Sequence, residues 1–233
     1  EWRDERSLFP DTIPTLDFRE VDLEAVQPDV IYIHNPYDEL NLITSVHPNY
    51  YSDALKKYCR TLVYIPYFVN ATTLERHFIA FAGVHNADYI IAENEEIRRQ
   101  YIDCYDGKDR DRIEEKVLAL GSPKYDAVAG DSRENYALPA DWEKKVQGKK
   151  VVLYLTTISP ILYYEDAVFK KMTEVFDYFR GQSDICLWWR PHPLIKSTLA
   201  NIGPKLLEEY EAIERAYLEE GVGIYDDTAE LHR

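Results

Sequence analysis

The chain has 233 residues, of which 45% are hydrophobic and 13% aromatic, a globular composition that excludes a disordered or collagen-like protein. Its formal net charge of −15 at pH 7 repels phosphate backbones and anionic lipid, which excludes a general nucleic-acid binder. The three cysteines, Cys59, Cys104 and Cys186, lack metal-ligand or Cys-x-x-Cys spacing and indicate a reduced protein.

Short β-rich runs alternate with helical patterns along the chain, which predicts an α/β fold with parallel sheets built from βαβ units. In the first half, the expected strands are 29–34, 61–66, 88–93 and 116–120. The expected helices are 49–59, 73–86 and 94–105, the last opened by Asn94 as its N-cap. The charged segment 106–112 is interpreted as a solvated turn, so no metal site is expected there.

A polar stretch over 129–148, with a weak helix around 141–146, separates two βα series. We therefore expect a first lobe over 1–135, a linker over 136–148 and a second lobe over 149–233. The second lobe is expected to hold strands over 150–155, 184–190 and 222–225, with amphipathic helices ended by Gly181 and Gly221. A capping box at Asp227 and Glu230 opens a helix close to the last residue, so we expect this lobe to be truncated.

The strand over 184–190 runs into Arg190, Pro191, His192 and Pro193, a polar ending that a buried strand does not need. Proline lacks the N–H that a central strand donates, so we expect the strand to stop at Arg190. Ligands of open α/β sheets bind beyond the carboxyl ends of the strands, where this sequence places Arg190 and His192. Arginine suits phosphate and histidine exchanges protons near neutral pH, which indicates an anionic ligand. The alternative is structural: Arg190 in an ion pair and His192 capping the next helix.

A second candidate follows the strand over 116–120. Gly121, Ser122 and Lys124 lie where a helix would begin, with Ser122 as its N-cap and Pro123 as its first residue. A helix N-terminus beyond a strand attracts anions, and Lys124 would add positive charge. The alternative is a simple turn from strand to helix.

A third candidate follows the strand over 150–155. The hydroxyl groups of Thr156, Thr157 and Ser159, with nearby backbone N–H groups, could cradle a phosphate. The segment holds no glycine, and the Walker and dinucleotide fingerprints are absent from the whole chain.

Two histidines of the first half, His34 and His47, lie close before prolines in segments that border expected strand ends. Either could act as a general base. Each could equally be a structural histidine whose hydrogen bonds are satisfied.

Four motifs, in this order, resemble the CDP-glycerol glycerophosphotransferase family, whose members build teichoic acids and related cell-surface polymers. They occupy 87–93, 121–126, 151–157 and 190–193, and the resemblance covers roughly 30–233. It implies the glycosyltransferase-B architecture, with two Rossmann-like lobes and the nucleotide held mainly by the second. It also implies that His192 lies near the donor phosphates beside Arg190, and that the Gly121–Asp126 segment closes the first lobe.

The implied reaction is attack of a polymer acceptor hydroxyl on the β-phosphate of CDP-glycerol, which releases CMP and needs no cofactor. The family's first-lobe base sits in a histidine–glycine motif, and the nearest equivalent here is His47, followed by Pro48. The family's Asp-Tyr-Ser-Ser-like donor motif would fall beyond Arg233, so the truncated chain is expected to hold an incomplete site.

The chain shows no apolar run near 18 residues and no signal peptide. We therefore expect a cytoplasmic protein, attached at most peripherally to the inner membrane face through residues outside this chain. Two other functions stay open. One is a glycosyltransferase-B enzyme that uses a nucleotide sugar, and the other is a non-catalytic two-lobed binding module.

Overall fold

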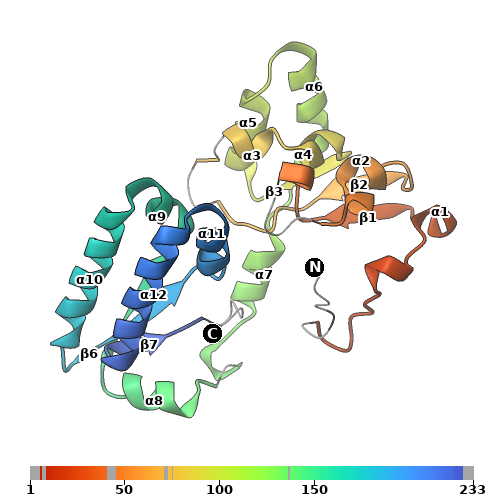
Figure 1. The fold of residues 1–233 in the computed structure, drawn as a ribbon. Coiled ribbons are helices and arrows are strands. Elements are labelled where there is room, and N and C mark those ends of the chain that lie inside the picture. The colour runs from red at the N-terminus through yellow and green to blue at the C-terminus, as the bar shows by residue number, and fades with distance from the viewer. Residues whose placement is uncertain are drawn as a thin grey trace. The chain divides into compact units, whose positions relative to one another are not determined.

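The computed structural model describes residues 6, 9–40, 46–70, 73–74, 76–135 and 137–227 (Figure 1). The chain divides into two compact units, Glu1–Gly130 and Asp131–Arg233, each built around its own parallel sheet. The predicted α/β class with two Rossmann-like lobes is therefore confirmed. The capping box predicted to begin at Asp227 continues into 228–231, which lies outside the described residues.

The first unit has a four-stranded parallel sheet in the order β1-β2-β3-β4. Its strands are β1 (Val30–Ile33), β2 (Thr61–Tyr64), β3 (Tyr89–Ala92) and β4 (Val117–Ala119). Its helices are α1 (Leu23–Val26), α2 (Ser52–Leu55), α3 (Arg76–Ile79), α4 (Ala82–Asn86), α5 (Glu95–Asp103), α6 (Gly107–Lys116) and α7 (Pro123–Ala129), with 3-10 turns η2 (Phe18–Glu20), η3 (Asp38–Leu40) and η4 (Pro48–Tyr50). The core of this unit centres on apolar side chains of the strands and of α5, among them Tyr64, Ile90 and Tyr101.

Three expectations for the first unit are wrong. The segment 106–112 is not a turn but the beginning of α6, because Ile113 and Lys116 are buried on the inner side of that helix and anchor it. The Lys116 ammonium group donates to the carbonyl oxygens of His85 and Ala87, at 2.8 and 2.9 Å. The single helix expected over 73–86 is also divided, into α3 and α4. The helix expected over 49–59 is reduced to the four residues of α2, preceded by the 3-10 turn η4.

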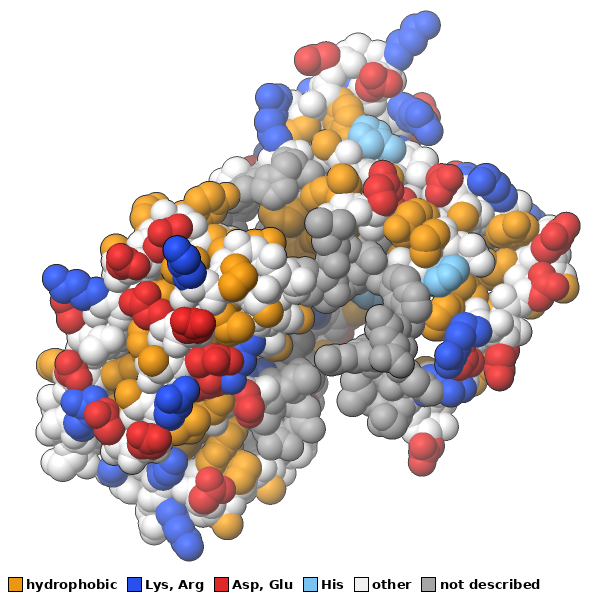
Figure 2. Space-filling view, in the orientation of Figure 1, with side chains coloured by type: hydrophobic (Ala, Val, Ile, Leu, Met, Phe, Trp, Pro, Cys, Tyr) orange, Lys and Arg blue, Asp and Glu red, His pale blue; other side chains and the backbone are white. Residues whose placement is uncertain are grey.

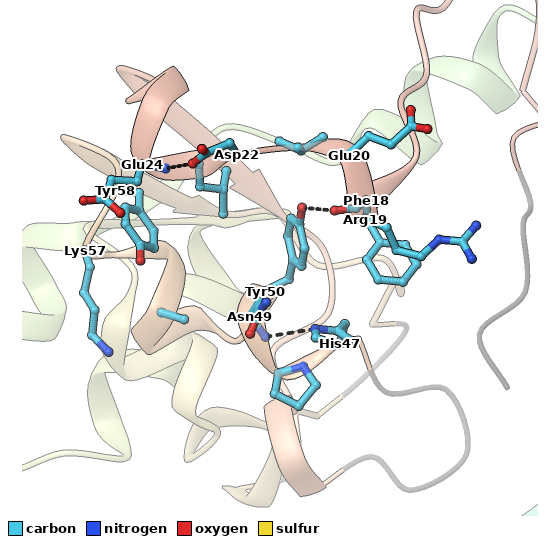
Figure 3. A pocket seen from close by; sticks show the side chains of 14 residues that line it. Phe18, Arg19, Glu20, Asp22, Glu24, His47, Asn49, Tyr50, Lys57 and Tyr58 are labelled. Carbon is cyan, nitrogen blue, oxygen red and sulfur yellow. Dashed lines mark hydrogen bonds between the residues drawn. The ribbon is translucent and has the colours of Figure 1, made fainter.

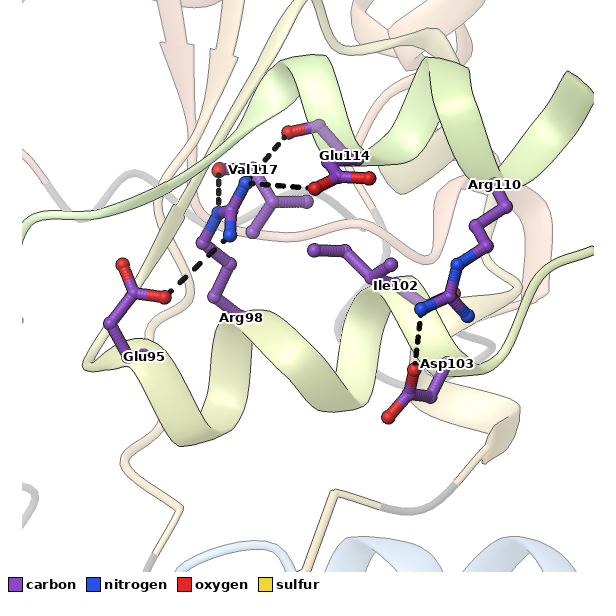
Figure 4. A network of polar contacts seen from close by, with 7 residues as sticks. All are labelled: Glu95, Arg98, Ile102, Asp103, Arg110, Glu114 and Val117. Atoms are coloured by element: carbon purple, nitrogen blue, oxygen red, sulfur yellow. Dashed lines mark hydrogen bonds and ion pairs between the residues drawn. The ribbon is translucent and has the colours of Figure 1, made fainter.

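Arginine side chains tie α5 to α6 and to β4 (Figure 4). Arg98 of α5 donates from Nε to the carbonyl oxygen of Val117 at 2.9 Å and from Nη2 to that of Glu114 at 3.2 Å. Arg110 of α6 donates to Asp103 Oδ1 at 2.9 Å. Because Val117 opens β4, this network fixes where α6 ends and the strand begins.

The second unit has a three-stranded parallel sheet in the order β5-β6-β7. Its strands are β5 (Lys150–Thr156), β6 (Ile185–Pro191) and β7 (Gly223–Tyr225). Its helices are α8 (Ala140–Val146), α9 (Ile158–Tyr164), α10 (Asp166–Arg180), α11 (Ile195–Ile202) and α12 (Pro204–Glu219), with the 3-10 turn η5 (Arg133–Asn135). The predicted strands and the helices ended by Gly181 and Gly221 are all present, while α9 and α11 were not predicted.

Strand β6 extends one residue further than expected, to Pro191, which pairs with Thr156 of β5. The next residue, His192, donates its N–H to the carbonyl oxygen of Thr156 at 2.9 Å. Successive residues face opposite sides of a strand, so the nitrogen of Pro191 faces the β7 side. The last bond on that side is from the N–H of Asp226 to the Trp189 carbonyl oxygen, and Pro191, which lacks an N–H, cannot continue the ladder beyond it.

The range 136–148, expected as a linker, contains α8. Trp142 of this helix packs edge-on against Trp188 of β6, with ring centroids 5.1 Å apart. Lys145 donates from Nζ to the carbonyl oxygen of Gly223 at 2.8 Å. Helix α8 therefore packs on the second sheet and belongs to that unit.

Large aromatic side chains form the core of the second unit, where Trp189, Tyr210 and Tyr217 are almost fully buried. The Tyr217 hydroxyl lies 3.0 Å from the Leu187 carbonyl oxygen and 2.9 Å from that of Ile224, so it bridges β6 and β7. Gly223 permits β6 and β7 to lie this close together, because a Cβ atom at this position would lie 2.0 Å from the carbonyl oxygen of Leu187.

Charged side chains of both signs are interspersed over the face shown in Figure 2, as is typical of solvated helix surfaces. The described part of the chain contains no cluster of three or more acidic, histidine or cysteine side chains suited to a metal ion. None of its helices combines the length and apolar character required to cross a membrane.

Candidate functional site

The carboxyl ends of β5, β6 and β7 bring Thr156, Arg190, His192 and Asp226 to one edge of the second sheet. We call these four residues the β6-end cluster. The sheet register pairs Leu155 with Arg190 and Thr156 with Pro191, and Asp226 follows directly after β7. This edge is where parallel α/β sheets bind their ligands.

Arg190 forms an ion pair with Asp226, a residue that the sequence analysis did not select. Its Nη1 lies 2.5 Å from Asp226 Oδ2, and the carboxylate is fully buried while 15% of the Arg190 side chain is exposed. The indole N–H of Trp188 donates to the same oxygen at 3.0 Å. The backbone N–H of Asp226 donates to the Trp189 carbonyl oxygen at 2.9 Å. The ion pair of the structural alternative is therefore present, and anion binding by Arg190 stays a prediction.

His192 is exposed, and the protein holds its ring in one orientation. The backbone N–H of Leu194 donates to His192 Nδ1 at 3.1 Å, so we infer that the neutral ring carries its proton on Nε2. Desolvation by the surrounding atoms lowers the pKa of His192 below the ordinary value of 6.5, which keeps the ring neutral at pH 7. The side chain therefore presents an Nε2–H donor beyond the end of β6. The bond that His192 accepts comes from Leu194, which precedes α11 as its N-cap residue, and α11 has no side-chain cap bond, so the capping role of the structural alternative is not seen.

The expected hydroxyl cradle after β5 is only partly formed. Thr156 Oγ1 accepts the indole N–H of Trp189 at 3.1 Å and is buried, so this hydroxyl faces the core. Thr157 is the N-cap of α9, makes no side-chain cap bond and is exposed. Ser159 is also exposed but lies within α9 and not in a loop. Thr157 and Ser159 are thus the two hydroxyl groups of the motif that reach the surface.

The predicted start of α7 in the first unit is confirmed. Ser122 is the N-cap, its Oγ accepting the N–H of Lys124 at 3.4 Å, and Pro123 is the first helical residue. Gly121 adopts φ +100°, which favours glycine. Gly121 and Ser122 line a pocket of about 490 Å³ on the face of the first sheet, whose other walls are mainly apolar and include the carboxylate of Asp126. This lining is poorly suited to a phosphate.

His47 lines a separate pocket of about 720 Å³ in the first unit (Figure 3). Its Nδ1 accepts the N–H of Asn49 at 3.2 Å, and its ring lies 5.5 Å from that of Phe18. A neutral His47 ring therefore carries its proton on Nε2, and this nitrogen can donate a hydrogen bond but cannot accept one. The role of His47 as a base stays a prediction. His34 does not line this pocket, and its ring lies 6.3 Å from that of Tyr67.

A buried polar cluster at the carboxyl ends of β2 and β3 was also missed. Glu93 follows β3, and its Oε1 accepts the N–H of Asn70 at 2.8 Å. The other Glu93 oxygen is buried without a hydrogen-bond partner in the described structure, and the buried hydroxyl groups of Tyr64 and Tyr101 face each other without a well-formed hydrogen bond. Burial, and then the charge of Glu93, raise the pKa of Tyr101, which shows that the two groups are close. The signal available in the sequence was the acidic residue directly after a strand.

The chain matches no family model and no curated protein. Among solved structures, it is similar to S. aureus MnaA in a co-structure with UDP, with 16% sequence identity and a TM-score of 0.46. The match covers 82% of this chain and 46% of that chain, so this chain spans less than half of that protein's length. Similarity at this level carries no inference about activity. The resemblance to the CDP-glycerol glycerophosphotransferase family stays a prediction.

Proposed function

We propose that the second unit binds the phosphate groups of a nucleotide-linked donor beyond the end of β6, and that the protein transfers part of this donor to an acceptor. The observation that carries the proposal is the His192 ring, which Leu194 holds in place and which presents an Nε2–H at the ligand-binding edge of the sheet. A neutral donor at this place can hydrogen-bond a phosphate oxygen without the cost of desolvating a charge.

The neighbours of His192 support an anionic ligand. Thr157 and Ser159 offer exposed hydroxyl groups after β5, and α9 begins at Ile158. Arg190 contributes positive charge that Asp226 partly offsets, while their ion pair fixes the direction of the guanidinium group. In a chain of net charge −15, such local donors are what a phosphate needs in order to bind.

The finer proposal is that the donor is CDP-glycerol, or a related CDP-linked polyol, and that the product is a surface polymer of the teichoic acid type. The order of the four sequence motifs supports it. An acceptor oxygen forms a bond to the β-phosphorus while the bond from this phosphorus to the bridging oxygen breaks, and CMP leaves with the electron pair. The acceptor proton passes to a base; His47, the candidate from the sequence, could take it only at Nδ1, after releasing the N–H of Asn49. The Nε2–H of His192 stabilises charge on the transferring group.

Donor binding is tested by thermal unfolding with CDP-glycerol, UDP-sugars and GDP-sugars in parallel. A ligand that binds only the folded state at about 100 times its Kd adds about 2.7 kcal/mol of stability, so the melting temperature rises. We expect CDP-glycerol to raise it, and His192→Ala to reduce the rise. Stabilisation by UDP-sugars alone would instead support the nucleotide-sugar enzyme.

Turnover is tested in the full-length protein by CMP release from CDP-glycerol with a poly(glycerol phosphate) acceptor. His192→Ala should lower the rate by about 10²–10⁴-fold, the usual range for a side chain that acts on the transferring proton or charge. The control is His85→Ala in the first unit, because the His85 ring packs against Tyr105 and lies outside the proposed site. Unchanged turnover in His192→Ala would remove His192 from the mechanism.

A further inference from the structure

A pocket of about 720 Å³ lies in the first unit, between the segment 18–24 on one side and η4, α2 and the residues after α2 on the other (Figure 3). All of the residues that line it belong to the described part of the chain. The Tyr50 hydroxyl donates to the Phe18 carbonyl oxygen at 2.6 Å and joins the two sides. Asp22 Oδ1 accepts the N–H groups of Glu24 and Ala25, each at 3.1 Å, and fixes the start of α1. The walls are therefore fixed by hydrogen bonds, and the volume lies within the range of about 300–1,000 Å³ that is usual for small-molecule sites.

Aromatic rings form part of the lining, and they belong to Phe18, Tyr50 and Tyr58. All three side chains are half-buried, and the rings of Phe18 and Tyr50 meet edge to face with their centroids 6.0 Å apart. The rings of Tyr50 and Tyr58 extend toward the segment that carries Asp22 and Glu24 (Figure 3). Aromatic faces pack against C–H groups, and the hydroxyl group of a tyrosine adds a polar contact at the end of the ring. The rings therefore favour a ligand whose surface includes C–H groups.

Hydrogen-bond donors and acceptors both line the pocket. His47 Nδ1 accepts the N–H of Asn49, so the neutral ring offers an Nε2–H donor. The exposed ammonium group of Lys57 is a second donor. The exposed carboxylates of Glu20 and Glu24 are acceptors. A hydroxyl group both donates and accepts hydrogen bonds, so a ligand rich in hydroxyl groups matches this lining.

The charges of the lining disfavour a phosphate and do not select a cation. The charged side chains are those of Arg19, Lys57, Glu20, Asp22 and Glu24. Arg19 is already paired, because its Nε donates to Asp17 Oδ1 at 2.8 Å. A phosphate would therefore meet mainly carboxylates, in a chain of net charge −15. Lys57 in turn opposes a second positive charge in the pocket. Charge thus favours a neutral ligand.

From these features we propose that the pocket binds a neutral, hydroxyl-rich small molecule, a sugar or a linear polyol. The C–H groups of this ligand pack on the rings of Tyr50 and Tyr58. Its hydroxyl groups donate to the carboxylate of Glu24 and accept from the His47 Nε2–H and from Lys57. This binding does not depend on the proposed function, whose donor site lies in the second unit.

Saturation-transfer nuclear magnetic resonance with the intact chain tests the proposal, with glucose, maltose and ribitol as neutral ligands. Glucose 6-phosphate and glucosamine are the charged counterparts of glucose. We expect saturation to pass from the protein to the C–H protons of the neutral ligands. Glucose 6-phosphate should bind at least about tenfold more weakly than glucose, because its phosphate meets the carboxylates of the lining. Glucosamine should bind no more tightly than glucose.

Two variants locate the ligand in this pocket. Tyr58→Ala removes a ring and should raise the Kd by about tenfold. Glu24→Ala removes an exposed carboxylate without touching the core and should raise the Kd by about threefold. Tyr178→Ala is the control, because Tyr178 is an exposed tyrosine of α10 in the second unit, and its Kd should equal that of the unsubstituted protein. Thermal unfolding verifies that each variant is folded.

Three results would overturn the proposal. The first is the absence of saturation transfer to glucose, maltose and ribitol alike. The second is an unchanged Kd in Glu24→Ala and in a folded Tyr58→Ala. The third is tighter binding of glucose 6-phosphate or glucosamine than of glucose, which would show a site for a charged ligand. None of these results bears on the thermal shift with CDP-glycerol, so the proposed function is tested separately.

Discussion

The carboxyl ends of the two sheets differ in how their polar groups are used. In the second unit, the guanidinium group of Arg190 and the indole N–H of Trp188 both contact one carboxylate oxygen of Asp226. The Thr156 hydroxyl accepts the indole N–H of Trp189. In the first unit, the buried groups at the corresponding place include one oxygen of Glu93 that has no partner in the described structure and the Tyr64 hydroxyl, which faces only that of Tyr101. One strand-end region is fully organised by its own hydrogen bonds, and the other is not.

This difference shows which region is pre-organised. A network that fixes β6 against β7 holds the neighbouring His192 in place before any ligand arrives, and such rigidity is what a binding site on a sheet edge requires. Unpaired polar groups, in contrast, lower the stability of the region that buries them. Substitutions in the two units should therefore have opposite consequences.

The largest effect is expected for Asp226→Ala. It leaves the guanidinium group of Arg190 and the indole N–H of Trp188 without their shared acceptor. Removal of one partner of a buried ion pair costs about 3–5 kcal/mol, and we expect a loss of this order in the free energy of unfolding. Urea denaturation followed by circular dichroism measures it.

Asp184 provides the control, because it is an exposed aspartate directly before β6, at the opposite end of the same strand. Asp184→Ala should change the free energy of unfolding by less than about 0.5 kcal/mol. Equal effects of the two substitutions would mean that the ion pair does not organise the end of the second sheet.

Removing the hydroxyl of a buried tyrosine should have a smaller effect on the free energy of unfolding, and the sign of this effect should differ between the two units. Tyr217→Phe removes the contacts with the carbonyl oxygens of Leu187 and Ile224 and should cost about 1–2 kcal/mol. Tyr64→Phe removes a buried hydroxyl that faces only the hydroxyl of Tyr101 and makes no well-formed hydrogen bond, so stability should stay the same or rise by up to about 1 kcal/mol. The same urea titrations compare them. A clear loss of stability in Tyr64→Phe would show that its hydroxyl is paired, for instance through a bound water.

The smallest effect concerns the titration of His192. Its pKa is lowered by desolvation, so nuclear magnetic resonance should show the ring taking up its proton below pH 6.5 in the folded protein. The unfolded chain takes up this proton first, so His192 contributes a loss of stability as the pH falls below about 6.5. His34 and His85 shift in the same direction for the same reason. A His192 pKa above 6.5 would indicate an acidic neighbour and would remove the neutral donor on which the proposed function rests.

Hydrophobic pattern and capping residues predicted most of the fold. The strands of both sheets, and the start of α7 at Ser122 and Pro123, follow from local signals. Helix α6 was missed because its sequence is almost entirely charged. Its stability comes from two buried side chains, Ile113 and Lys116, and the burial of a lysine against carbonyl oxygens cannot be read from the sequence.

The sequence placed Arg190 and His192 at the correct strand end but did not show what they contact. Asp226 lies 36 positions away from Arg190 and meets it only because β6 and β7 pair in parallel. Similarly, Thr156 appeared as a surface hydroxyl, whereas its partner Trp189 directs it into the core. Long-range pairing of this kind depends on sheet register, which residue pattern alone does not specify.

The contact of Trp142 with Trp188 has a spectroscopic consequence. The chain has four tryptophans, of which Trp142, Trp188 and Trp189 belong to the second unit. Trp188 stands between the ring of Trp142 and the carboxylate of Asp226, two environments that both change when β6 separates from its neighbours. Intrinsic fluorescence therefore reports mainly on the second unit, and its comparison with tyrosine absorbance distinguishes whether the two units unfold together or one after the other.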